Sequence, residues 1–206
     1  METTQCQHCW KSRADKVTLF RCSGCQIALY CSKECQKASW PSHKATCKLN
    51  SSRQAAMANQ DQSNKLKKLR SYCTKHRPAF TEFGLSALDL AQDPTRCTRD
   101  FLLITVMPVP DETRSEKAFF ASGAEVVSFD FFGKERGDEL RNQLKSYEQE
   151  AKRIGGISCI LVVVCDIVSS VQNICPVGFN DDIYQMETGR SWQLPLLQKL
   201  NSGIVH

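Results

Sequence analysis

Eight cysteine and histidine residues near the N-terminus restrict the possible folds of this chain more than any other feature. They form four spaced pairs, Cys6-x2-Cys9, Cys22-x2-Cys25, Cys31-x3-Cys35 and His43-x3-Cys47. A two-residue gap lets both sulfurs turn toward one ion, and a three-residue gap places two side chains about 5–6 Å apart on one helix face. Eight ligands divide into two tetrahedral sites, one with four cysteines and one with three cysteines and the histidine.

The number of ligands also indicates what the metal does. A catalytic zinc site uses three protein ligands and keeps one position open for water, whereas these residues fill two tetrahedra. We therefore predict two structural Zn²⁺ ions. A segment as short as residues 6–47 buries little apolar surface, so zinc binding is expected to supply most of its folding free energy, on the order of 10 kcal/mol per site.

The spacing does not decide which pairs share an ion, and it allows the first two pairs to bind one ion and the last two the other. His8, between the first two cysteines, is a further possible ligand. The two-residue gap favours Cys9 over His8, so we expect His8 at the surface.

Residues 6–47 resemble the MYND-type zinc finger, most distinctively in YCSKECQ (residues 30–36) followed by Trp40, His43 and Cys47. The resemblance implies a short β-hairpin plus helices and an interleaved use of the ligands. It assigns one ion to Cys6, Cys9, Cys31 and Cys35, and the second ion to Cys22, Cys25, His43 and Cys47.

MYND fingers are protein-interaction modules that take proline-rich peptides of the PxLxP kind, so the resemblance implies a partner protein with a proline-rich motif. The family's groove residues match Ser23, Gln36 and Trp40. The resemblance makes Trp40 the aromatic wall of the groove and Gln36 a polar contact to the peptide backbone. The alternative for Trp40 is packing in the small core of the finger, and the two roles are compatible because Trp often keeps one wet edge.

The distribution of charge suggests a second possible partner. Residues 1–77 carry 15 lysines and arginines against 4 aspartates and glutamates, whereas residues 78–206 carry 12 against 18. A basic region favours nucleic acid, so a nucleic-acid-associated transcriptional regulator is the alternative function. However, metal-bound thiolates offset about three of these positive charges. The lysines of residues 33–48 also alternate with small polar residues, without the aromatic interleaving that stacks bases.

Cysteine usage and hydropathy point to an intracellular protein, in the nucleus or cytoplasm. Of the 12 cysteines, 7 fall in the first 47 residues, in pairs that indicate metal ligation rather than disulfides. The N-terminus METTQCQHCW has no signal-peptide pattern. The longest apolar run, ILVVVC (residues 160–165), is far shorter than the roughly 20 residues that span a bilayer, so we expect no membrane association.

We predict three regions: a finger at 1–47, a linker or frayed helix at 48–64, and an α/β domain of unknown function at 65–206. In the last, the patterns predict strands at 101–109, 124–132 and 157–166, and helices at 79–91, 137–154 and 192–200. This order is typical of a small α/β or α+β domain. Within it, we expect Cys73 to be a core thiol and His76 to lie at the surface. The overall layout resembles fungal proteins with an N-terminal MYND finger and an α/β tail of unassigned activity.

We expect the chain to be non-catalytic. It has none of the standard nucleotide-binding or nucleophile motifs. Asp166, at the end of the apolar strand, could be catalytic, but an aspartate there more often closes a turn. Some MYND fingers lie inside SET-type lysine methyltransferases, where a split catalytic domain surrounds the finger; here the finger starts at residue 6 and no such catalytic motifs follow.

Overall fold

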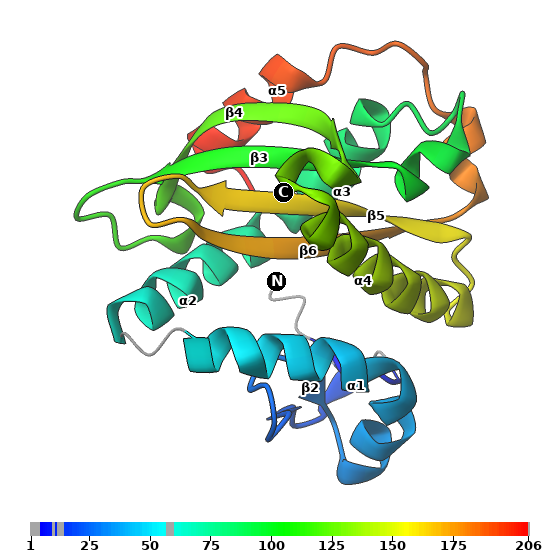
Figure 1. Cartoon of the computed structure of the whole chain (residues 1–206). Helices are drawn as coiled ribbons and strands as arrows, with labels where there is room; N and C mark the ends of the chain where they lie inside the picture. The colour runs from blue at the N-terminus through cyan, green and yellow to red at the C-terminus, as the bar shows by residue number, and fades with distance from the viewer. Residues whose placement is uncertain (1–4, 10, 12–14, 57–59, 206) are drawn as a thin grey trace. The chain divides into compact units, whose positions relative to one another are not determined.

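The structure is a computed structural model that describes residues 5–9, 11, 15–56 and 60–205 (Figure 1). The chain divides into two compact units, Met1–Ser63 and Asn64–His206, and each has its own buried cluster of hydrophobic residues. Within the described ranges, none of the helices combines the length and the apolar character needed to cross a membrane.

The N-terminal unit is built from a short hairpin and one long helix. Strand β1 (Phe20–Arg21) pairs antiparallel with β2 (Leu29–Tyr30), and helix α1 (Lys33–Ala56) follows. The Ser32 hydroxyl accepts a hydrogen bond from the backbone N–H of Cys35 (3.2 Å), which caps the start of α1. The hairpin and helix expected for the finger are therefore present.

Helix α1 extends past the end of the predicted finger. Residues 48–56, expected in a linker or frayed helix, continue α1, and helix α2 (Gln60–Lys75) begins just beyond. Residues 48–56 contain no glycine or proline, so their backbone can remain helical although they show no sustained apolar period.

The C-terminal unit is a four-stranded mixed sheet with helices. After α2, its elements are α3 (Arg77–Ala87), η2 (Pro94–Thr98), β3 (Asp100–Pro108), η3 (Ser115–Lys117), β4 (Phe119–Ser128), η4 (Phe129–Phe132), α4 (Lys134–Arg153), β5 (Ser158–Asp166), β6 (Val171–Phe179), η5 (Asp181–Gln185) and α5 (Gln193–Ser202). The strand order is β4-β3-β5-β6, in which β3 and β5 run parallel and the other neighbours run antiparallel.

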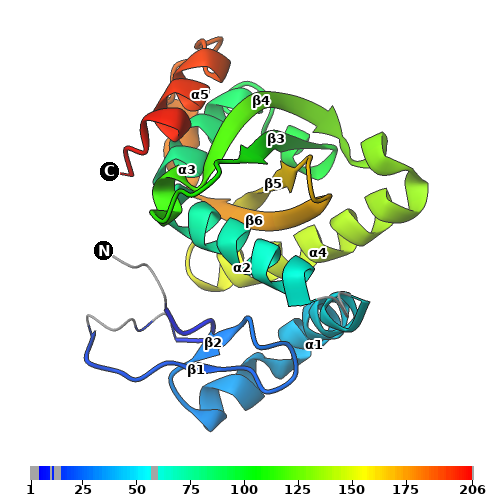
Figure 2. The same ribbon diagram turned by 90° about the vertical axis from the view of Figure 1, so that its left-hand side faces the viewer.

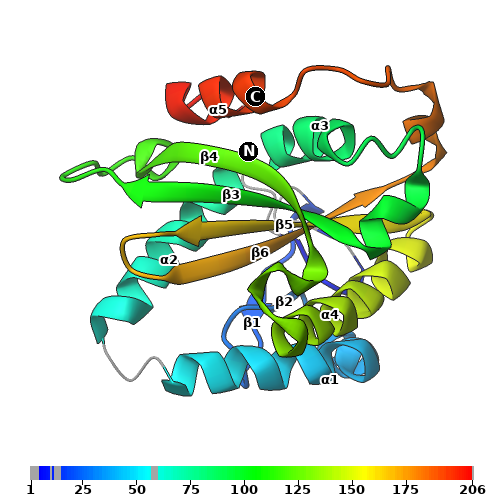
Figure 3. The ribbon, with the colours of Figure 1, turned by 45° about the horizontal axis from the view of Figure 1, so that its top comes forward.

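Helices cover both faces of this sheet, as Figures 2 and 3 show. On one face, Leu140 and Leu144 of α4 pack with Phe101, Leu161 and Val163. On the opposite face, α3 approaches so closely that a Cβ on Gly84 would lie 2.7 Å from the Cδ1 of Ile160. Strand β5 is buried on both faces between these layers, as its continuous apolar sequence predicts.

The free edge of β4 is occupied by side chains of α5. The Asn201 amide accepts a hydrogen bond from the N–H of Ala121 (2.7 Å) and donates one to the carbonyl of the same residue (3.0 Å). Gln193 donates to the carbonyl of Ala124 (2.7 Å). These amides satisfy main-chain groups that an edge strand would otherwise present to solvent.

Strand β6 was not predicted from the sequence. It contains Pro176 and Gly178, which normally weaken a strand assignment, but β6 lies at the edge of the sheet, where a missing N–H is tolerated. Asp166 closes the turn from β5 to β6, because its carboxylate accepts from the N–H groups of Val168 (3.0 Å) and Ser169 (3.4 Å). The Asp166 side chain therefore stabilises this turn.

The expectation that His76 lies at the surface is wrong. Its side chain is fully buried, its Nε2 is hydrogen-bonded to the carbonyl of Glu116 (2.8 Å), and its ring lies 4.4 Å from that of Tyr72. His76 directly follows the C-terminal end of α2. The identity of one polar residue does not indicate whether the chain places it in the core or at the surface after the helix ends.

Candidate metal centres

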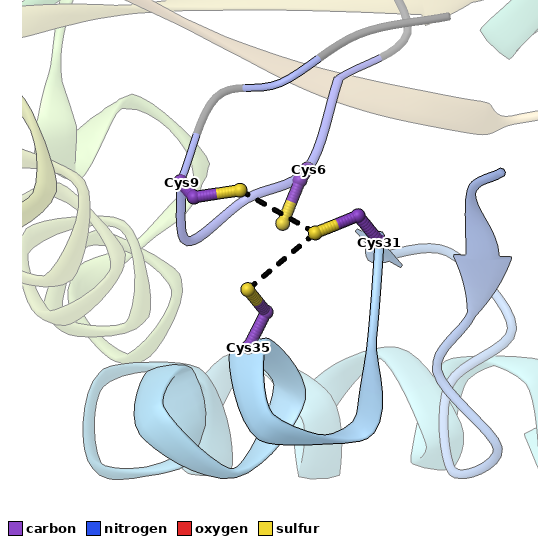
Figure 4. Close-up of side chains that lie close together, drawn as sticks. All are labelled: Cys6, Cys9, Cys31 and Cys35. Carbon is purple, nitrogen blue, oxygen red and sulfur yellow. Dashed lines mark hydrogen bonds between the residues drawn. The ribbon is translucent and has the colours of Figure 1, made fainter. Parts of the chain in front are cut away.

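The first group of candidate ligands joins three segments of the N-terminal unit. Cys6 and Cys9 lie in the chain before β1, Cys31 follows β2, and Cys35 is in the first turn of α1. Their four Sγ atoms all lie within 4.8 Å of one another. Figure 4 shows these sulfurs facing a common centre, with Sγ–Sγ distances of 3.4 Å from Cys9 to Cys31 and 3.5 Å from Cys31 to Cys35.

The second group lies between the hairpin and α1. Cys22 and Cys25 come from the turn after β1, and His43 and Cys47 lie one helical turn apart on α1. All four are buried, and their ligand atoms also lie within 4.8 Å of one another. Sγ of Cys22 lies 3.8 Å from that of Cys47, and Sγ of Cys25 lies 3.6 Å from Nε2 of His43.

This grouping resolves the pairing that the spacing left open. The two groups use the first and third pairs together and the second and fourth pairs together, which is the interleaved arrangement and not the sequential one. The hairpin explains it, because β1 and β2 separate the pair before β1 from the pair in the turn and carry Cys31 back toward Cys6. His8 is half-buried and belongs to neither group.

The donor sets fit zinc. A tetrahedral ion with Zn–S bonds of about 2.3 Å requires sulfurs about 3.8 Å apart, close to the distances observed. Hydrogen bonds to the sulfurs of Cys9 and Cys35 raise the pKa of Cys31 to about 12. Burial, together with the neighbouring sulfur of Cys22, raises the pKa of Cys47 to about 12. Thiols this close need a cation in order to ionise together, and the two groups fit two structural zinc ions.

The aromatic residues around His43 hold its imidazole in place. Tyr30 is fully buried, and its ring meets that of His43 edge-on at 5.8 Å. The ring of Trp40 also meets that of His43 edge-on, with the ring centroids 6.1 Å apart. Burial lowers the pKa of His43, which favours the neutral imidazole that a metal ion requires.

The predicted peptide-binding residues surround the second ligand group. Trp40 is 42% exposed and touches His43, so it is both a packing residue and a surface residue. Gln36, one turn earlier on α1, donates from Nε2 to the Sγ of Cys22 (3.5 Å). Ser23 is exposed and directly follows Cys22. Sequence reasoning did not anticipate the contact from Gln36 to a ligand sulfur, because only the fold brings α1 against the turn.

Comparisons with known proteins support the same reading of this unit. Residues 6–47 match the family model for the MYND finger, a protein-interaction module. Human "Histone-lysine N-methyltransferase SMYD3" is 50% identical over 40 residues, 19% of this chain and 9% of that protein. "SET domain and MYND-type zinc finger protein 6" of Schizosaccharomyces pombe is 50% identical over 46 residues, 22% of this chain and 9% of that protein.

A third relative is "N-lysine methyltransferase SMYD2" of Gallus gallus, 48% identical over 40 residues, 19% of this chain and 9% of that protein. The chain thus matches about a tenth of the length of these curated relatives, and the family match is confined to the finger. No solved structure matches the chain.

Proposed function

We propose that the MYND finger at residues 6–47 docks a proline-rich segment of a partner protein, and that the chain works as a non-catalytic interaction protein. The observation that carries this proposal is the position of Trp40. Trp40 is 42% exposed, while its ring and the His43 imidazole form an edge-on contact with their centroids 6.1 Å apart. Because a zinc ligand fixes the ring, a flat apolar surface is already ordered before a peptide binds, which reduces the entropic cost of binding.

Gln36 supplies a matching polar group. Its Nε2 already donates to the Sγ of Cys22, and no residue in the described ranges donates to its amide oxygen. A proline-rich segment in the polyproline II conformation forms no internal hydrogen bonds, so its main-chain N–H groups need acceptors. Gln36 can therefore accept one such N–H while the prolines pack on Trp40.

The non-catalytic role rests on the ligand sets. Each group has four protein ligands, so neither bound ion would keep a position for water or substrate. The methyltransferase names of the relatives belong to proteins of which this chain matches 9%. In the C-terminal unit, the strand-end carboxylate of Asp166 is already engaged by the turn from β5 to β6.

We also propose an intracellular location. The cysteines of the described ranges form no disulfide, and five of them, in the C-terminal unit, belong to neither ligand group. A chain with this many thiols and no disulfide suits a reducing compartment.

The test is a titration of the full chain and of Trp40→Ala with a PxLxP-type peptide, with zinc content measured in parallel. Loss of a central aromatic anchor costs about 2 kcal/mol or more, so affinity should fall roughly tenfold or further while both zinc ions stay bound. The matched control is Tyr184→Ala, which removes a 59% exposed aromatic side chain from the C-terminal unit. If Trp40→Ala binds the peptide like the parent chain, the docking proposal fails.

A further inference from the structure

One face of helix α1 carries positive charge on both sides of Trp40. The residues involved follow one another at intervals of four, three, four and four, and all five are exposed. They are Lys33, Lys37, Trp40, Lys44 and Lys48, here named the basic stripe. Pro41 lies inside α1 directly after Trp40, and Figures 1 and 3 show that α1 is bent. Lys33, Lys37 and Trp40 follow one another at one-turn intervals before Pro41, and Lys44 and Lys48 do so after it. Trp40 therefore has an exposed lysine about one turn away on each side.

The charge of the basic stripe is not neutralised within the described part of the chain. No carboxylate there forms an ion pair with any of the four lysines. Glu34 is the only acidic residue of α1, and it is engaged at the start of the helix. Its own backbone N–H, the Ser32 hydroxyl and the charges of Lys37 and Lys33 lower its pKa. The second ligand group with zinc adds a charge of about −1 beneath the surface, which is less than the lysines supply.

The spacing around Trp40 suits a short extended peptide. Lys37 and Lys44 are each about one helical turn from Trp40 along α1. A polyproline II segment advances about 3.1 Å per residue, so a side chain two or three residues before or after the residue on Trp40 would reach the lysine on that side.

We propose that the basic stripe selects partner segments with acidic residues on both sides of the proline-containing anchor. This inference rests on the proposed docking function and names the charge of the partner. A protein segment fits better than nucleic acid, because the stripe offers one aromatic ring rather than a series of stacking platforms. It also contains no arginine, the residue that recognises phosphate with two parallel hydrogen bonds.

The experiment compares three peptides with the same PxLxP core and with alanine, glutamate or lysine at the flanking positions. Each is titrated against the full chain at low and at high salt. Two exposed ion pairs predict that the glutamate-flanked peptide binds about fivefold more tightly than the alanine-flanked peptide at low salt. The advantage should vanish at about 0.5 M salt, where charges are screened. Equal affinities for these two peptides at low salt would overturn the inference and leave the docking proposal standing.

Charge reversal identifies the residues responsible. Lys37→Glu combined with Lys44→Glu should invert the preference, so that the lysine-flanked peptide binds best, while the zinc content stays that of the parent. The matched control is Lys67→Glu with Lys68→Glu, two exposed lysines of α2, which changes net charge equally and should leave the preference intact. If the control shifts the preference as much, the selectivity is a net-charge effect and the stripe is not the site.

Two further outcomes separate this inference from the proposed function. If no proline-rich peptide binds, whatever its flanks, both fail together. If a random-sequence DNA duplex binds more tightly than the glutamate-flanked peptide, and the reversal at Lys37 and Lys44 abolishes that binding, the stripe is a nucleic-acid surface and the acidic-partner inference is wrong.

Discussion

Gln36 donates a hydrogen bond from its side-chain amide to the Sγ of Cys22, over 3.5 Å. The contact joins a residue of the proposed peptide groove to a residue of the second zinc site. A sulfur that receives such a bond is better stabilised as the thiolate, and the amide that donates it is fixed in orientation. Metal binding and peptide binding at this finger are therefore expected to depend on each other.

Replacement of Gln36 by leucine should weaken the binding of one of the two zinc ions. Residues that hydrogen-bond to metal ligands typically contribute 10- to 100-fold to the affinity for the metal. We therefore expect the zinc affinity of the second site to fall roughly tenfold and that of the first site to change little. Competition with a chromogenic chelator measures both affinities. Lys37→Leu, at the next position of α1 but exposed, is the matched control. Two unchanged zinc affinities in Gln36→Leu would show that the contact contributes nothing to the metal site.

The purified chain should contain two zinc ions, bound by the two groups of four ligands. Elemental analysis should give a ratio of two in the parent and also in Cys165→Ser, which changes a half-buried thiol outside both groups. A ratio of one, or of more than two, contradicts the assignment.

Replacement of Gly24 by alanine is expected to weaken zinc binding at the second site. A Cβ at this position would lie 2.9 Å from the Sγ of Cys47, too close for a ligand sulfur held by a metal. Gly24→Ala should therefore release zinc faster on addition of a chelator. Ser23→Ala, the neighbouring substitution, introduces no such clash and should behave like the parent. Equal release rates for the two variants would mean that the turn relaxes without disturbing Cys47.

Removal of zinc should unfold the finger and leave the sheet intact. The two compact units each have their own core, and the N-terminal core includes the candidate metal ligands Cys6, Cys22, Cys25 and Cys47. After treatment with a chelator, hydrogen exchange should accelerate in residues 15–47, while β5 keeps its protection. Loss of protection across β5 would instead show that the two units unfold as one.

Buried His76 should make the C-terminal unit sensitive to acid. Burial lowers its pKa, although the carbonyl and the charge of Glu116 act in the opposite direction. The pKa of His76 in the folded chain therefore lies below its unfolded value of about 6.5. The contribution of His76 to the unfolding free energy is fully present above the unfolded pKa and is lost as the pH falls through the folded pKa. Tyr72, which faces the ring, stays neutral because burial raises its pKa well above its ordinary value.

The measurement is the difference in urea unfolding free energy between the parent and His76→Phe, followed from pH 8 to pH 5. Comparison of the two chains cancels any acid release of zinc from the finger. The parent should lose stability relative to the variant as the pH falls. A difference that does not change with pH would show that His76 does not titrate upon unfolding.

The sequence predicted the zinc sites more completely than the surface around them. Ligand spacing is a local property, so the pairs from Cys6 to Cys47 could be recognised without knowing the fold, whereas their grouping needed the hairpin or the family resemblance. Strand β5 was recognised because its side chains on both faces are apolar. Strand β6 was missed because Pro176 argues against a strand unless the strand lies at a sheet edge, and the sequence does not indicate that β6 does. The lysines of the basic stripe were recognised, but their relation to Trp40 was not, because the sequence does not show that Trp40 stays exposed beside Lys37 in α1.

The paired hydrogen bonds between Asn201 and Ala121 have a consequence for how this protein behaves among its own copies. A side-chain amide that accepts from and donates to one residue imitates the next strand of a sheet, so the sheet ends there instead of growing onto a neighbouring molecule. Helix α5 therefore prevents a further strand from adding to this edge of the sheet. A chain cut before α5 would expose the edge of the 10-residue strand β4 to intermolecular pairing, and proteolysis near Trp192 would therefore promote aggregation through this edge.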